Sequence, residues 1–307
     1  MITVLLATFN GQTYLVEQLE SLLNQTRLPD RIVIQDDHST DATGQILNDY
    51  QCSHPDLIKW TTSEAERGAR HNFMSMMIRE RDDYVMLCDQ DDVWLSDKIE
   101  QSLAKITDLE AQLAPGTPCL VHTDLTVVDE ALTPLGGSFR TNTFADYDRT
   151  TLRDQIIQNT ATGCTIIYNR ALADLIVTDP PHAVMHDWWI SLIAAAFGQI
   201  DHLEACTILY RQHTANQVGV TDMRRLSYKL NRFLHPDGVR ADIAKTYPQA
   251  EDFLRLFADR LNPTQTTFLR SYCQIPTRSK LGRVWSVVRL GVHKTGFSRN
   301  VAYLLFV

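Results

Sequence analysis

The fold is decided by the stretch YVMLCDQDD, residues 84–92, in which an apolar run ends in three carboxylates. Side chains that are apolar at successive positions predict a β-strand covered by helices on both faces. Ligands of such open α/β sheets bind beyond the carboxyl ends of the strands. The carboxylates that follow this strand are therefore candidates for a functional site.

Outward from this stretch, strand-like apolar runs alternate with helical periods through the first two thirds of the chain. The expected strands are Ile2–Thr8, Arg31–Gln35, Tyr84–Cys88, Leu120–Leu125, Thr165–Tyr168 and Thr207–Arg211. The expected helices are Tyr14–Asn24, Ala42–Tyr50, Asn72–Arg81, Asp97–Leu113 and one around Trp188–Phe197. This alternation predicts an α/β fold with a mostly parallel central sheet flanked by helices, over residues 1–217.

The remainder, residues 218–307, is expected to be a helical C-terminal region. Prolines 236, 263 and 276 break its helical periods, which are Leu226–Phe233, Asp237–Leu261, Thr264–Tyr272 and Arg278–Leu290. The chain holds 29 Lys and Arg against 37 Asp and Glu. The last acid is Asp259, and eight cations follow it. Residues 1–259 therefore carry a net charge of −16, and the tail after Asp259 carries +8.

Length and composition exclude several classes of protein. With 307 residues, 44% of them hydrophobic, the chain buries a full core. Its six cysteines form no C-x-x-C pair, which predicts a reduced, cytoplasmic setting. The N-terminus lacks the basic region of a signal peptide, and no run approaches the roughly 20 apolar residues of a membrane span. We expect neither an integral membrane protein nor a nucleic-acid partner.

The basic tail predicts a peripheral contact. Arg283 and Arg289 are interleaved with apolar residues, which is typical of a segment that binds an anionic membrane surface, here the inner face of the plasma membrane. The alternatives are that the tail packs against the acidic first domain or forms a homodimer contact.

The acid cluster Asp89-Gln90-Asp91-Asp92 predicts a divalent metal site. Three carboxylates this close repel one another unless a cation lies between them, and Mg²⁺ or Mn²⁺ would also bind phosphate oxygens. The alternative is a solvated acidic loop in which Ser96 and Asp97 cap the next helix. Apolar flanks on both sides favour the metal site. His213, at the end of the last strand, is a further candidate ligand.

Four other motifs carry candidate site residues. In Asp36-Asp37-His38-Ser39, a carboxylate can accept the imide N–H of uracil or thymine, although Ser39 or Thr40 can also be a plain helix cap. In His186-Asp187-Trp188-Trp189, both indoles can stack on a sugar while the acid takes a hydroxyl proton, or the indoles can be core residues and Asp187 a cap. Arg211 and the Arg70–Asn72 loop are candidates for phosphate binding. Gly163 begins a turn that enters a strand, for function or for backbone freedom.

Taken in order, VLLATFNG (4–11), SLLNQT (21–26), IQDDHSTD (34–41) and DQDD (89–92) resemble an inverting family-two glycosyltransferase with the GT-A fold, over about residues 1–217. Five further segments resemble bacterial rhamnosyltransferases of cell-wall and capsular polysaccharide assembly more closely. They are CDQDDVW (88–94), VHTDL (121–125), TGCT (162–165), MHDWW (185–189) and LYRQH (209–213).

The resemblance implies a role for each matching residue. Thr8, Asn10 and Asp37 would lie near the nucleoside and Asp89 near the ribose. Asp91 would bind the metal, and Asp92 could share it. Asp187 would be the catalytic base. Beside these, Gly163, Trp188 and Trp189 remain candidates, from the residues themselves, to face the sugar or acceptor. The donor would be dTDP-rhamnose or a UDP-sugar, and the acceptor a lipid-linked saccharide.

The implied reaction is direct displacement with inversion, in which Asp187 deprotonates the acceptor while the metal and Arg211 or Arg70 stabilise the departing diphosphate. The chain departs from the family pattern at His38, where glycine is usual. It also lacks the Q-x-x-R-W motif of processive synthases, which favours addition of a single sugar. A sugar nucleotidyltransferase would show a Gly-rich basic loop in place of ATFNG, and a non-catalytic sugar-binding module would leave the acid cluster unexplained.

Overall fold

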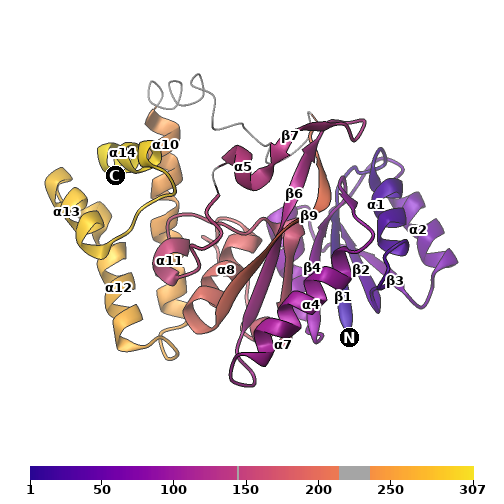
Figure 1. Ribbon diagram of the computed structural model, residues 1–307, viewed down its shortest axis with the longest axis horizontal. Helices are drawn as coiled ribbons and strands as arrows, with labels where there is room; N and C mark the ends of the chain where they lie inside the picture. Colours follow the sequence, from indigo (N-terminus) through magenta and orange to yellow (C-terminus); the bar gives the residue numbers. More distant parts are fainter. Residues whose placement is uncertain (144, 214–235) are drawn as a thin grey trace.

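The computed structural model of the chain describes residues 1–143, 145–213 and 236–307. Its strands are β1 (Ile2–Thr8), β2 (Arg31–Asp36), β3 (Ile58–Thr62), β4 (Tyr84–Asp89), β5 (Val93–Trp94), β6 (Cys119–Val128), β7 (Pro134–Ser138), β8 (Ile166–Asn169) and β9 (Gln199–Arg211). Within the described residues they form one nine-stranded sheet of order β3-β2-β1-β4-β8-β6-β9-β5, with β7 paired to β6. Figure 1 shows this sheet with the C-terminal helices to one side of it.

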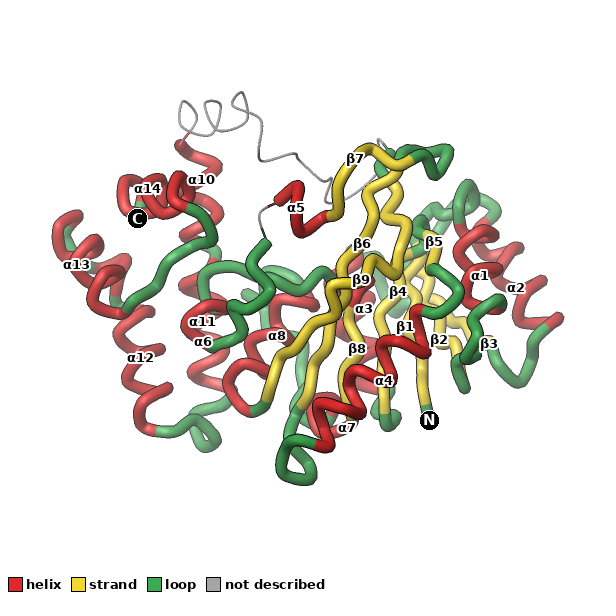
Figure 2. The backbone as a smooth tube through the Cα atoms, viewed as in Figure 1, coloured by secondary structure: helices red, strands yellow, loops and turns green. Residues whose placement is uncertain are grey.

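The helices flank this sheet and continue beyond it at the C-terminal end (Figure 2). Those of the first region are α1 (Leu15–Leu23), α2 (Thr43–Ser53), α3 (Ala69–Arg79), α4 (Lys98–Ala111), α5 (Phe139–Thr143), α6 (Leu152–Gln155), α7 (Arg170–Ala173), α8 (His186–Phe197) and the 3₁₀ turn η1 (Gly163–Thr165). Those of the C-terminal region are α10 (Pro236–Ala244), α11 (Thr246–Leu256), α12 (Pro263–Cys273), η2 (Ile275–Thr277), α13 (Lys280–Leu290) and α14 (Phe297–Phe306).

The sheet confirms the α/β prediction. Strand β1 lies parallel to β2 and β4, β2 is parallel to β3, and β6 is parallel to β9, while β8 joins the two parts by antiparallel pairing with β4 and β6. In this register Thr8 lies beside Asp36, and Ala7 beside Asp89. The strand ends that carry the predicted site residues therefore meet at one edge.

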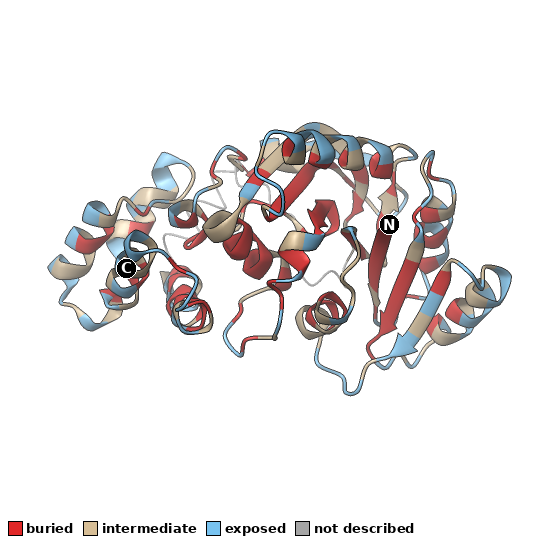
Figure 3. Cartoon of the chain, turned by 90° about the horizontal axis from the view of Figure 1, so that it is seen from below, coloured by how far each residue is buried: buried red, intermediate tan, exposed pale blue. Residues whose placement is uncertain are grey.

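Strand β1 shows why its apolar run had to be a buried strand. Val4 and Leu6 belong to the hydrophobic cluster on one face of the sheet, and Leu5 belongs to the cluster on the other. Because side chains alternate between faces along a strand, both faces must be covered. Figure 3 shows the central strands buried between layers of helices.

Several elements differ from their predicted bounds. Strand β3 was not expected, because only Ile58 is buried in this edge strand and its two threonines are exposed. Strand β9 begins at Gln199 rather than Thr207, because its polar first half pairs with β6. The region expected as one helix over 237–261 is two helices, α10 and α11, and α14 was not expected.

The C-terminal helices share a core with the first region. The Trp189 ring of α8 lies 5.4 Å from the Phe253 ring of α11, measured between centroids, and both belong to one continuous hydrophobic cluster. The predicted helix Leu226–Phe233 and the predicted boundary between residues 217 and 218 lie outside the described residues. Among the described helices, none has the length and apolar character required to cross a bilayer.

Candidate active site

A cavity of about 520 Å³ opens where β1, β2 and β4 end. At one end, here called the sheet end, it is lined by Thr8, Asp37, Glu66 and Gly68. Its other end, here called the helical end, is lined by Phe139 and Thr143 of α5, by Gln158 and by Arg299 of α14. Asp89, Asp91 and Asp187 lie among the remaining lining residues. The cavity thus joins the predicted site residues to the C-terminal region.

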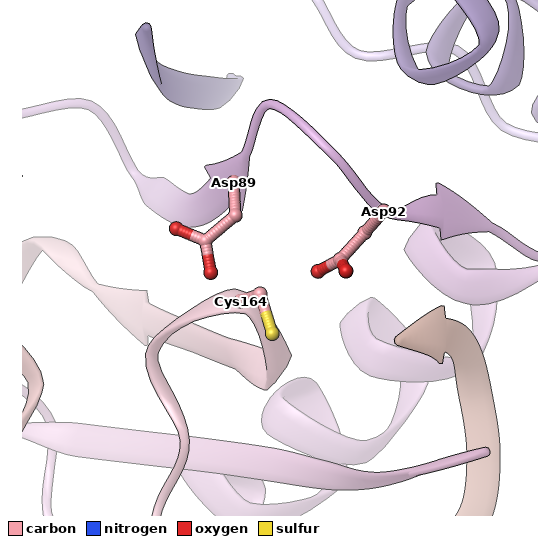
Figure 4. A group of neighbouring side chains, drawn as sticks. All are labelled: Asp89, Asp92 and Cys164. Carbon is pink, nitrogen blue, oxygen red and sulfur yellow. The ribbon is translucent and has the colours of Figure 1, made fainter. Parts of the chain in front are cut away.

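The acid cluster lies where β4 ends, as predicted. One ligand atom each of Asp89, Asp92 and Cys164 lies within 4.8 Å of the others (Figure 4). Burial, together with the charges of Asp91 and Asp187, raises the pKa of Asp89 to about 7. Burial, Asp89 and Asp91 raise the pKa of Asp92 well above its usual value. Such repulsion between carboxylates is what a bound cation would relieve.

Asp91 and Asp92 occupy different surroundings. The Asp91 carboxylate lines the cavity and lies 2.8 Å from Nε2 of His213, so the structure brings these two predicted ligands together. Asp92 is fully buried; its Oδ1 accepts the Arg211 N–H at 3.2 Å, and the Cys164 thiol also hydrogen-bonds to this carboxylate. The buried negative charge of Asp92 beside Asp89 fits a cation site.

Two groups beneath the cluster were not predicted. Burial and the charges of Asp92 and Asp89 raise the pKa of the Cys164 thiol well above its usual value, so it stays protonated between the two carboxylates. Lys98, at the start of α4, is fully buried with its Nζ 4.6 Å from the centre of the Trp94 ring. Burial lowers its pKa to about 8. A cation at this place partly offsets the buried negative charge of Asp92.

The loop after β1 is fixed to the acid cluster by Gln90. Its Oε1 accepts the Phe9 N–H at 2.8 Å, and its Nε2 donates to the Phe9 carbonyl at 2.9 Å. Gly11 leaves room for these two bonds, because a Cβ at this position would lie 2.3 Å from Oε1 of Gln90 and would displace its amide. Asn10 has φ of +48° and accepts the Thr40 N–H at 2.9 Å. Asn10 therefore fixes the loop and is not one of the described residues that line the cavity.

Asp37 and Asn72 line the cavity at its sheet end. The Asp37 carboxylate accepts the Gly68 N–H at 2.7 Å and the Ser63 hydroxyl at 2.9 Å. Nδ2 of Asn72 donates to the Gln35 carbonyl at 2.8 Å. Thr8 donates to Asp36 at 2.8 Å. These bonds hold the strand ends at fixed positions around the cavity.

His38, the position where the sequence departs from the family pattern, has φ of +65°. This left-handed backbone conformation favours glycine. A glycine would fit the backbone at this position without strain.

Asp187 faces the cavity from the first turn of α8. Its Oδ1 accepts the Trp188 N–H at 2.6 Å, its Oδ2 accepts the Gly163 N–H at 3.1 Å, and the Asn159 amide also hydrogen-bonds to it. Burial raises the pKa of Asp187 to about 6, against the lowering effect of these bonds. A carboxylate with a pKa this close to neutrality is suited to proton transfer.

Of the two roles considered for Trp188 and Trp189, the structure favours that of core residues over stacking on a sugar. The Trp188 side chain is buried and its Nε1 donates to the Gln155 carbonyl at 2.6 Å. The Trp189 side chain is buried against α11. Both indoles contribute to the core: Trp188 lies against α6, and Trp189 is covered by α11 of the C-terminal region.

The two predicted phosphate-binding arginines are held by protein groups. Nη1 of Arg70 donates to the carbonyls of Pro180 and Ala183, at 2.9 and 2.7 Å. The buried Arg211 side chain hydrogen-bonds to Glu17, and its Nε donates to the Asp91 carbonyl at 2.9 Å. Arg211 thereby fixes the backbone of the acid cluster.

Sequence reasoning missed the loop before η1 and its anchor in the C-terminal region. The Thr295 N–H donates to Oε1 of Gln158 at 3.1 Å, and Nε2 of Gln158 lies 3.3 Å from the Thr295 hydroxyl. Arg149 donates to the His293 carbonyl at 2.5 Å. Asn159, the neighbour of Gln158 in the sequence, hydrogen-bonds to the Asp187 carboxylate through its side chain. The turn between α13 and α14 therefore supports the residues around Asp187, a contact that no local sequence signal reveals.

This combination of a GT-A sheet, an acid cluster and a facing carboxylate defines a glycosyltransferase, and the comparison with known families agrees. The chain belongs to the family described as Glycosyl transferase family 2, whose model matches residues 3–175.

Two related proteins carry descriptions of their activities. A dTDP-rhamnosyl transferase, RfbG of Shigella flexneri, is 27% identical over 252 residues, which cover 78% of this chain and 82% of that protein. An Escherichia coli protein, WfaP, described as a UDP-Glc:α-D-GlcNAc-diphosphoundecaprenol β-1,3-glucosyltransferase, is 29% identical over 103 residues, or 34% of this chain and 40% of that one.

Two solved structures share the fold. Staphylococcus aureus TarS, residues 1–349, in complex with UDP has a TM-score of 0.56 at 17% identity, covering 91% of this chain and 73% of that one. A mannosyltransferase of Pyrobaculum calidifontis with GDP-Man and Mn²⁺ has a TM-score of 0.53 at 15% identity, covering 94% and 72%.

Proposed function

We propose that the protein is a metal-dependent inverting glycosyltransferase that moves one hexose to a saccharide acceptor in bacterial cell-wall or capsular polysaccharide synthesis. The observation that carries this proposal is the position of Asp187. Its carboxylate faces the same cavity as the acid cluster, and burial raises its pKa to about 6. A base and a diphosphate site must share one cavity for direct displacement to occur.

In the proposed reaction, Asp187 accepts the proton of an acceptor hydroxyl. The acceptor oxygen forms the new bond to the anomeric carbon as the bond to the nucleoside diphosphate breaks, and the configuration inverts. Asn159 and the N–H groups of Gly163 and Trp188 orient the base. Thr8 and Asp37 bind the nucleoside at the sheet end with Asn72 beside them, and Asp89 lies toward the ribose.

The residues present fit a divalent metal. Asp91, which lines the cavity, and His213 supply an oxygen and a nitrogen 2.8 Å apart, and Asp92 supplies a buried carboxylate close to Asp89. When bound, Mg²⁺ or Mn²⁺ would neutralise charge on the leaving diphosphate. Arg211 would hold the Asp91 backbone in place for this purpose.

The favoured donor is dTDP-L-rhamnose, which would yield an α-rhamnoside from a β-linked donor. The similarity to RfbG over most of both chains supports this choice. A UDP-hexose is the alternative, since TarS was solved with UDP and WfaP is described as using UDP-Glc. The description of WfaP, whose acceptor is a diphosphoundecaprenol sugar, also supports a lipid-linked acceptor.

A donor screen tests the function. The purified protein is incubated with each nucleotide sugar and Mn²⁺, and release of nucleoside diphosphate is measured with and without acceptor extract. Release from dTDP-rhamnose above all others is the expected result. Release from a UDP-sugar alone would select the alternative donor. No release from any donor would contradict transfer, and formation of nucleotide sugar from a sugar phosphate would instead indicate a nucleotidyltransferase.

A peripheral membrane location is part of the proposal. Helix α13 exposes Leu281, Trp285 and Val288, and Arg289 lies 4.9 Å over the Trp285 ring. Residues spaced by three or four lie on one helix face. An exposed apolar stripe within a segment of +8 charge matches an anionic lipid surface on the cytoplasmic side of the plasma membrane. A homodimer contact through this stripe is the alternative.

A further inference from the structure

The charges around the cavity are distributed unevenly. Carboxylates occupy its sheet end and its centre, where Asp37, Asp89, Asp91 and Asp187 face it. At the helical end lies Arg299 of α14, the only Lys or Arg among the described residues that line the cavity. The carboxylates disfavour anions along most of the cavity unless a metal is bound, and Arg299 places a cation at its helical end.

The helical end is the side on which an acceptor would enter. The nucleoside site at Thr8 and Asp37 lies beyond β1 and β2, whereas α5 and α14 lie on the other side of β4 (Figure 1). Asp187, the proposed base, lines the cavity together with residues 158–163 of the loop that Thr295 anchors. Arg299 belongs to the helix that follows this anchor.

Helix α14 has two different faces. Phe297, Val301 and Leu305 are spaced by four residues and form an exposed apolar stripe. Phe297 and Val301 each lie two residues from Arg299, which is a rotation of about 200° in an α-helix. Arg299 thus lies opposite the stripe, so that α14 presents a cation to the cavity and an apolar surface to the outside.

We propose that Arg299 binds a phosphate-type anion on the acceptor, next to the sugar that is glycosylated, while the apolar chain of the acceptor follows the outer surface of α14. This inference rests on the proposed function and specifies its acceptor subsite: the ligand is an amphiphile with an anionic linkage. An arginine suits this role, because its guanidinium makes charge-assisted hydrogen bonds to phosphate oxygens.

The donor diphosphate is the other phosphate that could reach Arg299. The test therefore measures two ligands separately by calorimetry. One is nucleoside diphosphate with Mn²⁺. The other is a short-chain isoprenyl diphosphate, added to protein whose donor site is already saturated with nucleoside diphosphate and Mn²⁺. The matching isoprenol, which lacks the diphosphate, reports apolar binding alone.

In the Arg299→Gln variant, we expect isoprenyl diphosphate to bind about tenfold to a hundredfold more weakly, the loss expected for a charge-assisted hydrogen bond. Binding of nucleoside diphosphate and of isoprenol should match the wild-type protein. Arg299→Lys should recover part of the affinity. Arg289→Gln, which removes an exposed cation of the same tail, should bind as the wild type does.

Three results would overturn the inference: no binding of isoprenyl diphosphate to the wild-type protein, equal binding to the wild type and Arg299→Gln, or an equal loss in Arg289→Gln. A loss of nucleoside diphosphate binding in Arg299→Gln would assign the arginine to the donor instead. None of these measurements requires transfer. Failure of the proposed function would instead appear as wild-type protein that releases no nucleoside diphosphate from any donor.

Discussion

The N–H of Gly163 donates to Oδ2 of Asp187 at 3.1 Å, and a Cβ at residue 163 would lie 2.9 Å from Nε2 of His186. The glycine therefore allows η1 to approach the first turn of α8. His186 cannot move away easily, because it is buried and stacked on Phe73 with ring centres 4.2 Å apart. The position of the proposed base depends on the absence of a side chain at residue 163.

We expect Gly163→Ala to lower the rate of transfer by about 10²-fold, the scale of loss that a misplacement of ~1 Å can cause. Nucleoside diphosphate binding should remain, since the sheet end is untouched. Steady-state kinetics and calorimetry provide the measurements. Gly238→Ala is the matched control, because an added Cβ there meets no atom within 4 Å. Wild-type turnover by Gly163→Ala would show that the close approach has no functional role.

Asp187→Asn should remove transfer and leave donor binding intact, because the base acts on the acceptor in the transition state. Loss of a general base typically costs about 10²–10⁴-fold in rate. The measured quantity is kcat for transfer, with calorimetry of nucleoside diphosphate in parallel. A variant that transfers sugar within a few-fold of the wild type would leave Asp187 as a structural residue of the first turn of α8.

The same carboxyl group predicts a pH dependence. Burial raises the pKa of Asp187 to about 6, so the group is protonated, and inactive as a base, below that pH. The rate of transfer should therefore rise as pH increases through about 6 and level off above it. A rate that is flat between pH 5 and 8, about one unit below and two units above this pKa, would contradict the assignment.

Asp91→Asn should abolish metal-dependent binding of nucleoside diphosphate while the fold stays intact, because this carboxylate faces the cavity rather than the core. Calorimetry with Mn²⁺ measures the loss, and thermal unfolding checks the fold. Asp97→Asn is the control; this acid accepts a hydrogen bond from Gln101 at 2.6 Å. Affinity in Asp91→Asn equal to that of the wild type would rule out the metal role.

The fold could be predicted where the residues of one short segment are enough to indicate its secondary structure and its burial. Strand β1 was predicted with its correct bounds because Val4, Leu5 and Leu6 are buried on both faces. Helix α14 was missed for the opposite reason. Its regularly spaced apolar residues, Phe297, Val301 and Leu305, are exposed. The spacing of apolar residues in this segment therefore does not indicate which face of the helix packs on the core.

The site could be predicted only where its residues follow strands. Asp37, Asp89 and Asp91 lie at strand ends, and the sheet register brings these ends together. Gln158 and Arg299 come from a loop and a distant helix that meet the cavity only after the C-terminal helices pack on α8. The role of the two tryptophans could not be decided from the sequence, because an indole beside an acid suits both a sugar site and a core, and only the packing around α8 favours the core.

The basic tail should bind vesicles that contain anionic lipid, and the exposed stripe of α13 should be responsible. Leu281, Trp285 and Val288 are 84%, 54% and 66% exposed, so their replacement by serine leaves the core unchanged. Deleting the tail would be a poor test, because Leu269 and Tyr272 of α12 are buried in the shared core.

We expect co-sedimentation of the wild-type protein that requires anionic lipid and weakens with salt, since the attraction is screened. The triple serine variant should remain in the supernatant with an unchanged melting temperature, whereas a serine variant of Val177, an exposed residue outside the tail, should bind as the wild type does. Wild-type protein that stays in the supernatant at low salt would refute membrane binding, and a stripe variant that dissociates a wild-type dimer in solution would instead assign the surface to a second copy of the chain.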